Sequence, residues 1–214
     1  RLHEYREDFA AAIGEYIKLL DTVQLSYQHV RNNINRAKTA GDDLGAIQKI
    51  VADYHFNNPE SILAAKLLTE MLYNAGDIDR AYSVIYRTAK GQNNAVEALE
   101  FAETLRRDGH SEQALSAYRE YYNHFTDAEN RVEALKISAS IERDLGRVER
   151  AIGDYQRIIE NYAGTKDAAD AGLRLIQISA YMTSFEGYTR ILEEYAASTE
   201  FPEVAFEGYY SLGD

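Results

Sequence analysis

The sequence predicts an all-α protein built from stacked helix pairs, and three observations support this fold class. Only two of the 214 residues are proline, so few positions interrupt a helix. Apolar residues recur at spacings of four and eight, which places them on one face of a helix. A short motif also returns at intervals of about one helix pair. No segment shows the alternation of apolar and polar residues that is typical of a half-buried strand.

The recurring motif has a small residue, an apolar residue directly after it, and a tyrosine or isoleucine four residues after the small one. Successive copies are 33 to 37 residues apart. The small residue allows a neighbouring helix to approach closely, and the larger residue fills the space one turn later. We therefore expect this face of each second helix to be buried. The six copies begin at Ala12, Ala46, Ala81, Ala114, Ala151 and Gly187.

A glycine stands five residues before four of these small residues, at Gly41, Gly76, Gly109 and Gly146. Glycine ends helices well because it adopts a left-handed backbone conformation without strain. Each unit is therefore predicted to be a helix, a tight turn and a second helix. One such pair cannot bury its apolar face alone, so the pairs must stack on one another.

The element order follows from these landmarks, and residues 1–214 are predicted to form a single repeat domain. Pro59 and Pro202 mark helix starts, since proline suits the first turn of a helix. Because the chain begins and ends inside a repeat, we expect it to be a piece of a longer array. The predicted units are a half repeat at 4–25, helix pairs at 26–58, 59–93, 94–126, 128–163 and 166–198, and the start of a further helix at 201–214.

These units resemble tetratricopeptide repeats (TPR), whose second helix carries an alanine followed four residues later by an aromatic residue. The first helices match more loosely, with Leu68 and Leu72 before Gly76 and Phe101 and Leu105 before Gly109. The tryptophan of the family is absent from the whole chain. The resemblance implies a right-handed superhelix (an α-solenoid) of about five helix-turn-helix repeats, with a concave groove lined by the first helices.

A weaker likeness concerns the ends of two second helices. The segments 155–162 and 191–198, followed by Val204 and Ala205, resemble bacterial envelope TPR proteins of the outer-membrane assembly lipoprotein and Tol-Pal-associated types. Those helix ends typically read Tyr-Pro-x-Ser, and the proline is missing here. This resemblance implies a location in the bacterial periplasm or envelope, whereas a chain without cysteine suits either redox environment.

Composition excludes several classes of partner and chemistry. The formal net charge of −12 opposes non-specific binding to nucleic acid or to an anionic membrane surface. The longest uncharged stretch, Leu175–Phe185, has 11 residues, and a membrane-spanning helix needs about 20. We therefore expect no nucleic-acid partner and no direct insertion into a membrane.

No pattern of catalytic residues is present, and we predict that the protein is not an enzyme. The five histidines lack metal-ligand spacing, and neither a phosphate-binding loop nor a nucleophile elbow occurs. Glu97, Glu100 and Glu103 are spaced as a solvated helix stripe. The absence of cysteine removes disulfides, thiolate metal sites and a cysteine nucleophile. We predict no catalytic residues, no metal site and no cofactor.

The predicted groove is richer in basic residues than the chain as a whole. Positions ten, six and three residues before each turn glycine share one face of the first helix. Six of these twelve positions hold arginine or lysine and two hold glutamate. A basic groove would complement an acidic or carboxylate-bearing segment of a partner protein. The candidate binding residues are Arg31, Asn35, Lys38, Lys66, Tyr73, Arg106, Lys136 and Arg143.

The sequence thus predicts a non-catalytic protein–protein interaction scaffold or adaptor that binds a partner segment in its groove. One alternative is a structural module that self-associates through half repeats at its two ends. Another is a carbohydrate-binding accessory domain of an envelope export machine, for which exposed aromatic rows in the groove would be typical. Tyr73 is the one aromatic residue among the twelve groove positions.

Overall fold

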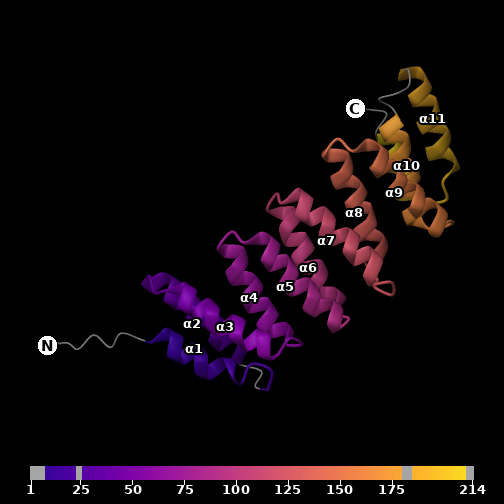
Figure 1. The fold of residues 1–214 in the computed structure, drawn as a ribbon. Coiled ribbons are helices and arrows are strands. Elements are labelled where there is room, and N and C mark those ends of the chain that lie inside the picture. The colour runs from indigo at the N-terminus through magenta and orange to yellow at the C-terminus, as the bar shows by residue number, and fades with distance from the viewer. Residues whose placement is uncertain (1–7, 23–25, 180–184, 211–214) are drawn as a thin grey trace. The chain divides into compact units, whose positions relative to one another are not determined.

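The computed structural model describes residues 8–22, 26–179 and 185–210. Within these ranges the chain forms helices and turns and contains no strand (Figure 1). This confirms the all-α fold class and the repeated, helix-after-helix architecture. The helices are α1 Phe9–Ile17, α2 Ser26–Ala40, α3 Leu44–Asn57, α4 Ile62–Asn74, α5 Ile78–Gly91, α6 Ala95–Arg107, α7 Ser111–His124, α8 Arg131–Asp144, α9 Val148–Asn161, α10 Lys166–Ser179, α11 Phe185–Ser198 and α12 Pro202–Tyr210.

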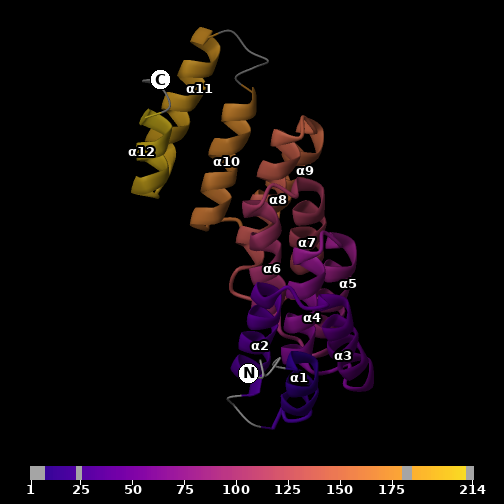
Figure 2. The same ribbon diagram turned by 90° about the vertical axis from the view of Figure 1, so that its left-hand side faces the viewer.

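The chain divides into two compact units, Arg1–Phe101 and Ala102–Asp214, and the division falls inside α6. In the first unit α1 packs on α2, α3 on α4, and α4 on α5. In the second unit α7 packs on α8, α8 on α9, α9 on α10, and α11 on α12; Figure 2 shows α10, α11 and α12 side by side. Most of these contacts therefore join helices that follow one another in sequence.

The four predicted turn glycines end their helices in the left-handed conformation. Their φ angles are 74° at Gly41, 83° at Gly76, 83° at Gly109 and 75° at Gly146. In each turn the N–H after the glycine donates to the carbonyl five residues earlier, as from Asp77 to Leu72 at 2.9 Å. This bond satisfies a carbonyl that the helix end would otherwise leave unpaired. The prediction of glycine turns is therefore confirmed.

Replacing Gly146 with alanine is expected to lower the free energy of unfolding by about 1–2 kcal/mol, because the left-handed conformation costs an L-residue that much. A Cβ atom at this position would meet nothing within 4 Å, so the cost comes from the backbone alone. Gly153 is equally open but lies inside α9, and Gly153→Ala should raise stability by about 0.5–1 kcal/mol. Urea unfolding followed by circular dichroism measures both variants. Equal losses would contradict this explanation.

Helix starts are fixed mainly by polar caps. The Asp43 carboxylate accepts hydrogen bonds from the N–H groups of Gly45 and Ala46 at the start of α3. The start of α4 differs from the prediction, because the helix begins at Ile62 and not at Pro59. The Ser61 hydroxyl accepts the cap bond from the Ala64 N–H at 3.1 Å, so the serine determines where this helix begins. Pro202 begins α12 as predicted.

The second-helix motif is buried as expected in α5, α7 and α9. Its small residues Ala81, Ala114 and Ala151 are all 0% exposed. Four residues later, the larger motif residues of these helices are at most 3% exposed: Ile85, Tyr118 and Tyr155. These alanines therefore lie in the packed interior.

In α1, α3 and α11 the buried row lies one residue later than the motif predicts. Ala46 of α3 is exposed while Ile47 and Val51 are buried. Tyr16 of α1 and Ile191 of α11 are 39% and 38% exposed. The interpretation of these motif residues as core was therefore wrong. In α1 and α3 an isoleucine follows the alanine directly, so two adjacent rows could be buried and packing selects the second.

A group of ion pairs lies inside the second unit, on α7, α8 and α9. The Glu142 side chain is 0% exposed, and its carboxylate lies 2.8 Å from the Arg119 guanidinium. Arg147 and Arg150 approach the same carboxylate at 3.5 and 3.8 Å. Arg119 also contacts Asp154 at 3.0 Å, which links α7 to α9. The buried negative charges are therefore compensated by several arginines.

The first unit buries a histidine at the end of α3. His55 is 4% exposed and neither ring nitrogen has a hydrogen-bond partner within the described part of the chain. Burial lowers its pKa from 6.5, the positive charge of Arg87 lowers it further, and the charge of Glu60 opposes this shift. The folded state therefore favours the neutral imidazole.

Stability is expected to fall as the pH drops below about 6.5, because the unfolded chain then binds a proton at His55 that the folded chain does not. The contribution of the neutral His55 to stability is complete above that pH. Below it, the free energy of unfolding falls by at most about 1.4 kcal/mol per pH unit. Urea unfolding across this range measures it. His55→Phe should remove this part of the pH dependence, and an unchanged profile in that variant would contradict the assignment.

Candidate functional site

Two hollows gather most of the predicted groove residues, one within each unit. Arg31, Asn35 and Lys38 line the first, and Lys136 and Arg143 line the second. Lys66, Tyr73 and Arg106 belong to neither.

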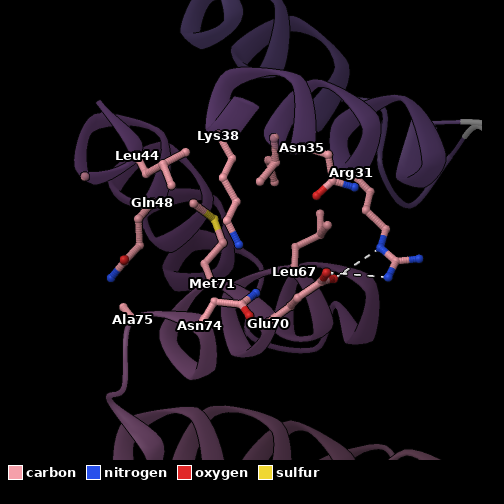
Figure 3. Close-up of a pocket in the computed structure, with 12 residues that line it drawn as sticks. Arg31, Asn35, Lys38, Leu44, Gln48, Leu67, Glu70, Met71, Asn74 and Ala75 are labelled. Atoms are coloured by element: carbon pink, nitrogen blue, oxygen red, sulfur yellow. Dashed lines mark hydrogen bonds and ion pairs between the residues drawn. The ribbon is translucent and has the colours of Figure 1, made fainter. Parts of the chain in front are cut away.

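The hollow of the first unit lies between α2, α4 and the beginning of α3 (Figure 3). Its volume is about 270 Å³. Leu67 and Met71 of α4 are 1% and 9% exposed, and they present apolar surface to it. The left-handed turn at Gly41 and the Asp43 cap bring the start of α3 to its edge. The complete lining is Arg31, Ile34, Asn35, Lys38, Leu44, Gly45, Gln48, Leu67, Glu70, Met71, Asn74 and Ala75.

One ion pair crosses this hollow, from α2 to α4. The Arg31 Nε atom lies 3.2 Å from the Glu70 carboxylate, and this hydrogen bond raises the pKa of Arg31. Lys38 differs, because no described residue forms an ion pair or a hydrogen bond with its ammonium group. Figure 3 shows its side chain extending from α2 toward α4. The hollow therefore holds one compensated and one uncompensated cation.

The two other predicted residues of the first unit contact α6. The Lys66 Nζ atom lies 2.8 Å from Glu97 and 3.7 Å from Glu100. Burial lowers the pKa of Lys66, but the hydrogen bond to Glu97 and the nearby charges outweigh that effect and raise it. The Tyr73 ring packs edge-on against Phe101, with the ring centroids 5.9 Å apart. Both side chains thus take part in packing α4 on α6.

The hollow of the second unit is mainly polar and holds about 390 Å³. The Lys136 ammonium contacts Glu133 at 3.0 Å, Asp170 at 3.1 Å and Asp167 at 3.2 Å. Its burial lowers the pKa, and the hydrogen bonds to Glu133 and Asp170 outweigh the burial and raise it. Arg143 contacts Asp144 at 3.0 Å. The positive charge expected here is therefore largely compensated.

Arg106 lies beside the hydroxyl group of Tyr118, one of the buried motif residues. Burial raises the pKa of Tyr118, and the charge of Arg106 lowers it in part. The arginine side chain itself remains exposed. Arg106 is therefore open to solvent, and its charge acts on a tyrosine in the core of the second unit.

Several lining residues were not predicted. Glu70 occupies one of the twelve predicted groove positions but is not among the candidate binding residues. Gln48 and Asn74 enter the first hollow through the packing of α3 and α4. Asp170 and Arg174 line the second hollow from α10. The groove positions were predicted by counting back from a turn glycine. Because no turn glycine follows α10, this spacing could not predict these two residues.

The described ranges contain neither a candidate metal-ion site nor a helix that could span a membrane. No three histidine, aspartate or glutamate side chains lie close enough together there to hold a metal ion. A bilayer-spanning helix needs about 20 mostly apolar residues, and none of the described helices meets that requirement. No protein-family model matches the sequence, and the comparison with curated proteins gives no significant match.

Proposed function

We propose that the chain is a non-catalytic protein-interaction module of the tetratricopeptide-repeat type. In this proposal its helix pairs form a right-handed superhelix, and the first helices of the pairs bind a segment of a partner protein. The observation that carries the proposal is the hollow beside α2, which gathers Arg31, Asn35 and Lys38 in one open, partly apolar depression. Such a surface suits a protein segment with both apolar and charged groups.

A site-specific photo-crosslinker tests this proposal, because it reports which face touches a partner. Benzoylphenylalanine in place of Asn35 lies in the hollow, and in place of Lys49 it lies on the exposed side of α3. We expect the crosslinker at position 35 to form covalent adducts with a partner protein, and the crosslinker at position 49 to form few. Adducts from the second position alone would overturn the proposed binding face.

A second candidate function is self-association, and α12 supplies the observation that favours it. Phe206 and Tyr210 are 71% and 63% exposed, and their rings stack with centroids 6.4 Å apart. Tyr209 is 49% exposed on the same helix. Exposed aromatic residues in contact with each other are typical of interaction surfaces. Sedimentation of the protein over a range of concentrations tests this candidate, and a constant monomer mass would exclude it.

A further inference from the structure

The hollow of the first unit combines an apolar floor with a lysine that has no ion-pair partner among the described residues. The floor comes from the buried Leu67 and Met71 of α4, with Ile34 and Leu44 at its sides. The hollow's volume of about 270 Å³ is many times what one ordered water molecule needs. This is room for one leucine-sized side chain together with a neighbouring carboxyl group.

The charges in this hollow favour an anionic group. Arg31 and Lys38 supply two positive charges, and Glu70 supplies one negative charge that Arg31 holds by its ion pair. Lys66 and Lys136, by contrast, each contact at least two carboxylates. Lys38 is therefore positioned to bind a carboxylate supplied from outside, in a chain whose own net charge is −12.

Three carboxamide side chains also line the hollow, and each comes from a different helix: Asn35 from α2, Gln48 from α3 and Asn74 from α4. None of these amides has a hydrogen-bond partner among the residues that the structure describes. A carboxamide donates and accepts hydrogen bonds, so it matches the N–H and C=O groups of a peptide backbone. This set of groups is suited to an extended peptide segment.

We infer that this hollow binds an internal peptide segment in which a leucine-sized apolar side chain stands next to an aspartate or glutamate. The apolar side chain lies on Leu67 and Met71, and the acidic side chain pairs with Lys38. Asn35, Gln48 and Asn74 hydrogen-bond the backbone of the segment. This inference rests on the proposed function and adds the chemistry of the segment that is bound.

Selection of random dodecapeptides displayed on phage against the whole protein tests the inference. Enriched sequences are expected to carry an apolar residue beside an acidic one, and their binding should be lost in Lys38→Glu. Enriched peptides that lack this pattern, or that ignore Lys38→Glu, would overturn the inference and leave the interaction function standing. If no peptide were enriched above an empty surface, the inference and the proposed function would both fall.

A fluorescein-labelled peptide with blocked ends and an Asp-Leu-Asp core measures the two contacts separately. Exchanging both aspartates for asparagine, or the leucine for serine, should each weaken binding at least tenfold, as should Lys38→Glu. Lys49→Glu is the matched control, because Lys49 is exposed on α3, lies outside the hollow and has no partner among the described residues. If Lys38→Glu and Lys49→Glu weakened peptide binding equally, general charge attraction would explain the binding. That result would contradict the inference.

Discussion

Replacing Glu142 with alanine is expected to lower the free energy of unfolding by about 3 kcal/mol, the largest single effect we anticipate. The carboxylate is 0% exposed and lies within 4.0 Å of three arginines. Its removal leaves Arg119 and Arg147 without a charge that they share, and breaking a buried ion pair from one side costs about 3–5 kcal/mol. The lower end of that range applies because both arginine side chains are 35% exposed.

Urea unfolding measured by circular dichroism checks this expectation against two controls. Glu149→Ala removes an exposed carboxylate of α9 that has no partner among the described residues, and it should change stability by less than about 0.5 kcal/mol. Glu142→Gln keeps the volume of the side chain and removes its charge. If glutamine restored full stability, volume and not charge would explain the loss.

Replacing Ala151 with leucine is expected to cost about 2–3 kcal/mol, because the added carbons have no space to enter. Ala151 is 0% exposed, and it belongs to a core cluster with Leu135, Tyr155 and Ala171. Overfilling a well-packed core displaces side chains and helix backbones. The same urea titration measures the loss.

The control for this prediction is Ala46→Leu, which places the same side chain at the same motif position of α3. Ala46 is exposed, so the substitution should change stability by less than about 0.5 kcal/mol. Comparable losses at both positions would show that α3 buries its motif alanine and would contradict the shifted row described above.

The all-α class and the turn positions could be predicted because they depend on local chemistry. A glycine such as Gly76 fixes a helix end through its own backbone freedom, whatever packs around it. The buried row of α3 could not be predicted in the same way. Ala46 and Ile47 both suit a helix core, and which of them faces inward depends on the helices packed around α3.

The same distinction between local chemistry and tertiary packing applies to the candidate site. Arg31, Asn35 and Lys38 share one helix, so their spacing alone brings them to one face. Two of the predicted basic residues, however, pair with carboxylates on other helices: Arg31 with Glu70 and Lys136 with Asp170. This compensation of charge between helices depends on tertiary packing. The sequence therefore predicted a more basic groove than the two hollows form in the structure.

The shifted buried row limits how freely these repeats could be exchanged. One residue along a helix turns the side chain by about 100°, so α3 and α5 present different faces to their neighbours although both carry the motif. In α5, α7 and α9 the motif alanine is buried, whereas in α1 and α3 the isoleucine after it is buried. A helix pair taken from the middle of the chain and placed at its beginning would therefore turn an alanine toward neighbours that pack against isoleucine. Recombination or consensus engineering of this chain would therefore have to keep each repeat with the neighbours that its own helical face fits.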